Sequence, residues 1–355
     1  MSNLIEYNNK LAIHPGYYIE ELIEELGISQ EDYAKKLGTT PKNLSILLRG
    51  EQSLSADMAM KISRLTGTSI KLWTNLQSAY DAAMAEIRSE QETDKEKGVL
   101  KSLDYRFFRD HFRLPSLPHD TSGQVTEIRK FLDLASLTIL EKPDLTVSFR
   151  KKKDQSQTDL IRTNAMVMIG MNETLKTKAP PYRRARFKEA VQQAAELTKD
   201  HRDLLPQLTN IFRESGVILV ILPNMPGCRM NGASRRVGDK VMLVVTERRL
   251  SADTFWFTLF HEAGHILKSD FGLSSGDAKE EAADSFAQQL LIPEEKYQEF
   301  VSRRQFTRSA VETFAEEIRR IPEIVLGRLQ YDGLVSYKDP AFEDLRHRYK
   351  TDPVI

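Results

Sequence analysis

The chain has 355 residues, more than the ~100 to 200 of a typical single domain, which predicts two or three domains. Its 51 basic and 51 acidic side chains give a net charge of zero, which excludes a broadly basic nucleic-acid coat. The single cysteine, Cys228, excludes an intrachain disulfide and a thiolate zinc cluster. The longest aliphatic run, residues 217–222, is too short to span a membrane, which indicates a cytoplasmic protein without membrane contact.

Residues 1–87 are expected to form an all-α domain of five helices. Apolar residues recur at helical spacing between glycines, which suit the left-handed end of a helix. The expected helices cover residues 15–26, 29–37, 40–49, 55–65 and 69–87, and the glycines are Gly27, Gly38, Gly50 and Gly67.

The second and third of these helices have the pattern of a helix-turn-helix. Ser29 and Thr40 are expected N-caps, and Gly38 lets the chain reverse between the two helices. Residues 44, 47 and 48 form the buried stripe, so the polar residues near the start of the third helix point outward, where a recognition helix reaches base edges. The expected DNA-binding residues are Gln30, Thr40, Lys42, Asn43, Ser45, Ile46 and Arg49.

Charge only partly favours DNA binding. Residues 1–87 hold eight basic and eleven acidic residues, but residues 29–64 hold six basic and four acidic ones. An ordinary helical bundle is therefore the alternative. If the domain does bind DNA, we expect a dimer with a modest salt dependence.

Residues 14–81 closely resemble the HigA-type antitoxins, which are Xre-like helix-turn-helix proteins. The resemblance rests on the segments HPG, GISQ, SADMA and WTNLQSAYD. It implies an operator-binding domain, a homodimer and a cognate toxin as protein partner.

The middle of the chain is the least informative part. Residues 88–102 are almost without apolar side chains until Val99, which indicates either a linker or a solvated extension of the preceding helix. We place a domain boundary there. Residues 103–205 are expected to form a mainly helical spacer, with the basic segment 150–157 as a solvated loop.

Residues 206–355 are expected to form an α+β domain. Short runs rich in β-branched residues at 217–222 and 241–246 predict strands, and helices follow. The second strand is expected to lie in the core, with an edge that pairs with an extended peptide as the alternative.

The segment FTLFHEAGHILK carries the clearest chemical signal. On a helix, His261 and His265 are four residues apart and lie on one face, where they can bind one zinc ion. Glu262 lies beside them and is expected to take a proton from a water molecule that the metal activates. Two histidines that bind no metal are the alternative.

A catalytic zinc needs a third protein ligand. Glu280 and Asp284 are four residues apart on the next expected helix, so we expect Glu280 to bind the metal and Asp284 to orient an imidazole. Glu281 is the alternative ligand. Three further side chains could stabilise an oxyanion, and no pattern selects among them: Arg235, Arg236 and Tyr331.

Residues 208–335 resemble the ImmA/IrrE-type metallopeptidases, which are zincin-like gluzincins. The matching segments are GVILVILPNMPGCRMNGASR, FWFTLFHEAGHIL, EEAADSFAQQLLIP and IPEIVLGRLQYDGLV. The family pattern carries its zinc ligands onto His261, His265 and Glu280, and its catalytic acid onto Glu262. Ala282 stands where the family often has a second acid, which is not a ligand position. One Zn²⁺ per chain is expected, and Mn²⁺ accepts the same ligands.

Three functions are compatible with these patterns. The first is a DNA-binding regulator with a zinc endopeptidase that cleaves a repressor, a toxin or itself. The second is a non-catalytic antitoxin and autorepressor with structural zinc. The third is a general peptidase whose helical domain only docks substrates. The intact HEAGH segment favours the first.

Overall fold

The computed structural model describes residues 3–143, 156–199, 201–249, 251–269, 277–345 and 347–349. Most of the basic segment 150–157 thus lies outside the described residues. The chain divides into two compact units, Met1–Lys95 and Glu96–Ile355. None of the helices in the described part of the chain has both the length and the apolar composition that a membrane span requires.

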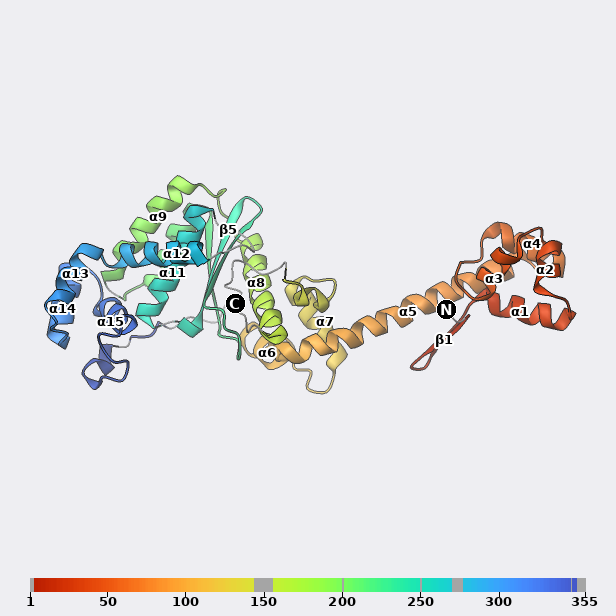
Figure 1. Cartoon of the computed structure of the whole chain (residues 1–355), viewed down its shortest axis with the longest axis horizontal. Helices are drawn as coiled ribbons and strands as arrows, with labels where there is room; N and C mark the ends of the chain where they lie inside the picture. Colours follow the sequence, from red (N-terminus) through yellow and green to blue (C-terminus); the bar gives the residue numbers. More distant parts are fainter. Residues whose placement is uncertain are drawn as a thin grey trace. The chain divides into compact units, whose positions relative to one another are not determined.

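The amino-terminal unit is a helical bundle preceded by a hairpin (Figure 1). Its helices begin at side-chain caps: the hydroxyls of Ser29, Thr40 and Ser55 each accept a hydrogen bond from the backbone N–H three residues later. Its core is formed by apolar side chains of all five helices, among them Ile19, Leu47 and Trp73. The helices are α1 (Pro15–Leu26), α2 (Gln30–Leu37), α3 (Pro41–Leu48), α4 (Ala56–Thr66) and α5 (Ile70–Leu103).

The hairpin was not expected from the sequence. Strands β1 (Leu4–Tyr7) and β2 (Lys10–Ile13) pair in antiparallel register. Polar bonds hold the tip of the hairpin to α5: the ammonium of Lys10 lies 3.0 Å from carboxylate oxygens of both Glu86 and Glu90, and the Tyr7 hydroxyl donates to Asp94 at 2.6 Å.

The HPG segment closes the bundle at the start of α1. The ring of His14 caps the helix by accepting a hydrogen bond from the N–H of Gly16 at 2.9 Å. A Cβ atom on Gly16 would lie 2.4 Å from the carbonyl oxygen of Leu47 and 2.9 Å from that of Leu48. Only glycine therefore lets α1 approach the end of α3 this closely.

Replacement of Gly16 by alanine is expected to destabilise the bundle by about 1–3 kcal/mol, because backbone atoms of α3 must move away from the added methyl group. Native-state hydrogen exchange of the α1 and α3 amides measures this. Gly98→Ala is the matched control, since nothing lies within 4 Å of a Cβ there. Equal exchange in both variants would contradict the close approach.

Helix α5 continues through the polar segment 88–101, so this segment is helical. Of the two alternatives that the sequence left open, the structure has the helix extension. Its glutamates, its lysines and Gln91 are good helix formers, which allows a helix to continue without apolar contacts on every turn.

The second unit is built around a small mixed sheet, as expected for an α+β fold. The helices before the sheet are α6 (Tyr105–Phe112), α7 (Thr121–Leu132), α8 (Gln157–Lys176), α9 (Arg184–Glu196) and α10 (Leu204–Glu214). The strands are β3 (Val217–Leu222), β4 (Gly232–Val237) and β5 (Lys240–Thr246). The helices after it are α11 (Ala252–Lys268), α12 (Asp277–Leu291), α13 (Glu294–Ser302), α14 (Arg308–Glu317) and α15 (Pro322–Tyr331). Short 3-10 helices are η1 (Leu137–Glu141), η3 (Leu197–Lys199), η4 (Glu247–Arg249) and η5 (Pro340–Leu345).

The strand order is β3-β5-β4. Strand β5 runs parallel to β3 and antiparallel to β4. Residues 241–246 thus lie in the central strand, which confirms the core position, and the alternative that they offer an edge to a peptide is wrong. Both edges of β5 are already hydrogen-bonded to neighbouring strands.

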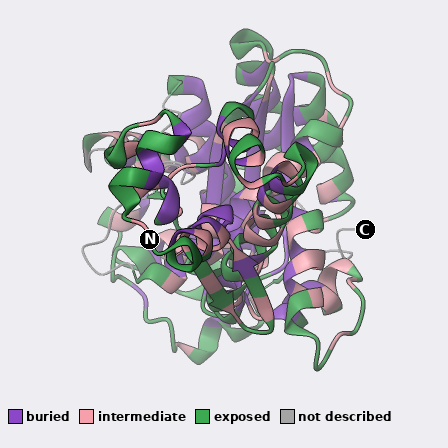
Figure 2. Ribbon diagram, turned by 90° about the vertical axis from the view of Figure 1, so that its right-hand side faces the viewer, coloured by how far each residue is buried: buried purple, intermediate pink, exposed green. Residues whose placement is uncertain are grey.

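The two faces of the sheet pack against different helices. Val241, Leu243 and Val245 share a core with α9, α10 and α11, whereas Met242 and Val244 share one with α8. This alternation is the period of two expected for a strand buried on both faces. Figure 2 shows the buried residues gathered on the strands and on the inner faces of the helices. The helices of residues 103–205 therefore include α8, which covers one face of the sheet.

Candidate functional site

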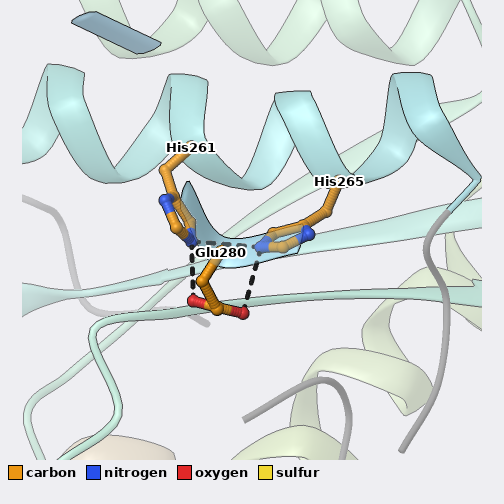
Figure 3. Close-up of side chains that lie close together, drawn as sticks. All are labelled: His261, His265 and Glu280. Carbon is orange, nitrogen blue, oxygen red and sulfur yellow. Dashed lines mark hydrogen bonds and ion pairs between the residues drawn. The ribbon is translucent and has the colours of Figure 1, made fainter. Parts of the chain in front are cut away.

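Helix α11 places two histidines on one face (Figure 3). Its other positions are mostly apolar and buried, which anchors the helix against the sheet. His261 and His265 are one turn apart, and their Nε2 atoms are separated by 3.1 Å. His265 is buried, with 2% of its surface exposed.

Helix α12 brings two carboxylates to these rings. The oxygens of Glu280 lie 3.5 Å from the Nε2 atoms of both His261 and His265. One turn later, Asp284 accepts a hydrogen bond from Nδ1 of His261 at 2.8 Å. This bond fixes the tautomer that leaves Nε2 of His261 as the metal-binding atom.

The donor set fits a divalent cation. The ligand atoms of His261, His265 and Glu280 all lie within 4.8 Å of one another. Two atoms that are each about 2.1 Å from a tetrahedral ion are roughly 3.4 Å apart, close to the separations observed here. Two imidazoles and one carboxylate are the three protein ligands of several catalytic zinc sites.

Electrostatics also favour a positive charge between these residues. Burial lowers the pKa of His261, but hydrogen bonds to Asp284 and Glu280 outweigh burial and raise this pKa to about 10. Burial raises the pKa of Glu262 to about 7, against the opposing effects of His261 and Ser234. The Glu262 carboxyl can therefore take up or release a proton near neutral pH.

Strand β4 lies against Glu262, which the sequence did not predict. A Cβ atom on Gly232 would lie 2.9 Å from both Cγ of Glu262 and Cγ2 of Thr258, so only glycine fits at this point of the strand. The buried Ser234 lies two residues further on the same side of β4. One sequence signal could have located β4. Gly238 and Asp239 are typical of a two-residue hairpin turn, and they lie between the paired residues Val237 and Lys240.

The remaining predicted residues lie around this centre. Glu281 is exposed on α12, and the structure brings Glu280, not Glu281, to the histidines. Arg236 lies over the ring of Tyr182, at 5.9 Å from its centroid, and donates to the carbonyl of Gly238. Tyr331, which is 70% exposed, lines a cavity beside α11.

Replacement of Asp284 by asparagine is expected to weaken metal binding about 10- to 100-fold, because His261 loses the carboxylate that orients its ring. Competition with a chelating dye measures the affinity. Glu281→Gln removes an exposed carboxylate from the same helix and is expected to leave the affinity unchanged. Equal affinities for wild type and Asp284→Asn would contradict this role.

The predicted DNA-binding residues lie on and around α3 in the first unit. Lys42 is exposed, and Ser45 and Ile46 are half-buried on the side of α3 opposite its core residues. Gln30 is exposed at the first position of α2. The hydroxyl of Thr40 accepts from the N–H of Asn43 at 3.2 Å, so it caps α3.

Two of these side chains are held by neighbours. The amide of Asn43 donates to the hydroxyl of Thr39 at 3.0 Å and accepts from the amide of Gln52 at 3.1 Å. Gln52 was missed in the sequence because it lies beyond the end of α3. The guanidinium of Arg49 bonds Ser45 at 2.6 Å and Glu51 at 2.8 Å, which offsets its charge.

Comparison with protein families identifies both units. Residues 19–73 match the helix-turn-helix family, and residues 224–330 match the IrrE N-terminal-like domain of peptidase family M78. The second match spans β4, β5, α11 and α12, and so includes the His, His, Glu cluster. Members of this peptidase family are typically metal-dependent.

Curated relatives match the first unit over most of their own length. The uncharacterized HTH-type transcriptional regulator YddM of Escherichia coli (strain K12) is 39% identical over 79 residues, which are 22% of this chain and 84% of the relative. Virulence-associated protein I of Dichelobacter nodosus is 36% identical over 80 residues, 22% of this chain and 74% of the relative.

Two solved structures are also similar to the first unit. An addiction module antidote protein of the HigA family from Coxiella burnetii is 36% identical and covers 23% of this chain and 91% of its own, with a TM-score of 0.22. PA4674 from Pseudomonas aeruginosa, solved in complex with its operator DNA, is 34% identical and covers 22% of this chain and 88% of its own, with a TM-score of 0.21.

The helix-turn-helix and IrrE-type resemblances found in the sequence are confirmed by the two family matches, and the fold class with them. The chain belongs to the helix-turn-helix transcriptional regulators through its first unit and carries an IrrE N-terminal-like domain of peptidase family M78 in its second.

Proposed function

We propose that this chain is an operator-binding regulator that cleaves a specific protein by metal-dependent hydrolysis. The observation that carries the proposal is the buried cluster of His261, His265 and Glu280 with Glu262 beside it. Zinc is the proposed metal, and Mn²⁺ accepts the same ligands. The three ligands, the role of Asp284 and the role of Glu262 are all part of this proposal.

Glu262 is the proposed general base. When bound, a divalent cation lowers the pKa of a water molecule and polarises a carbonyl group. The carboxylate of Glu262, buried and with its pKa near 7, takes the proton from the attacking water and later gives it to the nitrogen of the leaving amine. Burial keeps bulk water from competing for that proton.

The substrate chain is proposed to pair with β4. This strand is at the edge of the three-stranded sheet, and β5 is its one partner among the strands of the described residues. Its residue Gly232 lies directly against Glu262, so an extended peptide along β4 passes the general base. Strand β4 thus takes the peptide-pairing role that the sequence left open for β5, because both edges of β5 are already paired.

The first unit supplies operator binding. Lys42, Asn43, Ser45 and Ile46 are proposed to face the major groove from α3, with Gln30, Thr40 and Arg49 at the border of the contact. A homodimer and a cognate toxin remain predictions from the resemblance to HigA-type antitoxins. A repressor, a toxin or the chain itself remains the predicted substrate of the peptidase.

The proposal is tested on the full chain, purified without added metal. Metal content is measured for wild type and His261→Ala, and each is incubated with the proteins encoded beside it. We expect one metal ion per wild-type chain, none in the variant, and cleavage of a neighbouring protein by wild type alone. Metal without any cleavage would favour the non-catalytic antitoxin, and a wild type without metal would contradict the site.

A further inference from the structure

A cavity of about 380 Å³ lies beside the metal cluster in the second unit. Three of its lining residues are neighbours of site residues. The ring of Phe257 is 6.2 Å from that of His261, Thr258 packs beside Glu262 beneath Gly232, and Gln288 is one turn beyond Asp284 on α12. A peptide held over Glu262 can therefore place an adjacent side chain in this cavity.

Apolar and aromatic side chains form about half of the cavity wall. The ends of α12 and α15 contribute aliphatic side chains, and two tyrosines lie near the rim. These residues are Leu291, Ile292, Ile324, Tyr331 and Tyr337. Such walls suit the long methylene stem of a lysine or arginine as well as an apolar side chain.

The charged residues of the cavity distinguish a lysine or arginine side chain from an apolar one. Asp253, in the first turn of α11, lines the cavity and is half-buried. Within the residues that the structure describes, no side chain bonds its carboxylate. Arg328 also lines the cavity, but its charge is compensated by Asp332 at 2.9 Å and Glu294 at 3.8 Å. Among the lining residues that the structure describes, the charge without a side-chain partner is thus the negative one of Asp253.

We infer that this cavity binds a lysine or arginine side chain of the substrate next to the bond that is cut, with Asp253 as the residue that selects it. The inference rests on the proposed peptidase function and adds to it the class of substrate residue. A half-buried carboxylate in apolar surroundings binds a cation more strongly than an exposed one, because less water screens the pair.

Binding and cleavage are measured with two random peptide pools, one with lysine and one with norleucine at a fixed central position. Binding uses the zinc-loaded Glu262→Gln variant, and cleavage uses zinc-loaded wild type. We expect about tenfold or stronger preference for the lysine pool in both measurements. Adding Asp253→Asn to either protein is expected to remove this preference while binding and cleavage of the norleucine pool stay unchanged.

Glu281→Gln is the matched control, because it removes an equal charge from the exposed face of α12, outside the cavity. It is expected to keep the preference for lysine. Equal binding of both pools, or a preference that survives Asp253→Asn, would overturn the inference. Cleavage of both pools at equal rates would support the proposed peptidase function and contradict the inference about the cavity. Selective binding of the lysine pool without cleavage by wild type would support the inference about the cavity and contradict the proposed peptidase function.

Discussion

Replacement of Glu262 by glutamine is expected to lower the rate of peptide cleavage about 10²- to 10⁴-fold while one metal ion per chain is retained. The amide has nearly the same shape as the carboxylate but cannot accept the proton. Glu262 lies outside the group His261, His265 and Glu280 that is proposed to bind the metal, so the metal is expected to stay. Metal content and kcat on the same preparation measure both effects.

The pH dependence of wild type is a separate test of the same residue. Burial raises the pKa of the Glu262 carboxyl to about 7, so the basic form is present above this pH and is lost as the pH falls through it. A cation bound by the neighbouring histidines favours the carboxylate and lowers this pKa. The acid limb of kcat/KM is therefore expected at or below pH 7. A rate that is constant down to pH 4 would contradict Glu262 as the base.

The metal centre could be predicted from the sequence because helix geometry fixes it locally. His261 and His265 are four residues apart, and this spacing places them on one face of any α-helix. The same rule relates Glu280 to Asp284 on the next helix. Spacing alone could not decide between Glu280 and Glu281, because the rotation of α12 against α11 depends on their packing.

The surroundings of the centre could not be predicted, because they depend on strand order. Residues 232–237 contain glycine, serine and two arginines and have few features of a strand, yet they form β4 and pass Glu262. The chain reverses at Gly238 and Asp239, so β4 pairs with β5 on the side opposite β3. That pairing buries β5 in the centre and leaves β4 at the edge.

The amino-terminal hairpin was missed for a similar reason. Its strands are only four residues long, and its turn at Asn8 is a weak local signal, although Asn8 has a positive φ of 52°. The hairpin is stabilised by contacts with Glu86, Glu90 and Asp94, more than seventy residues away in the chain. A polar segment such as 88–101 therefore has structural partners that its own sequence does not reveal.

Replacement of Asn43 by alanine is expected to weaken binding to the specific operator about 5- to 150-fold, with little change in binding to unrelated DNA. Asn43 is held in one orientation by Thr39 and Gln52, so its amide reaches the groove without further ordering. Gln52→Ala is expected to produce part of the same loss, because Asn43 then becomes mobile. Electrophoretic mobility shifts with operator and unrelated duplexes measure both.

Lys42→Ala is expected to behave differently from Asn43→Ala, although the two residues are adjacent. Lys42 is exposed at the start of α3 and suits a phosphate contact, so its loss weakens binding to both duplexes and reduces the salt slope by about 1. Lys71→Ala removes the same charge from α5 and serves as the control. Equal effects of Asn43→Ala on operator and unrelated DNA would mean that α3 contacts only the backbone, and the specificity would then lie elsewhere in the unit.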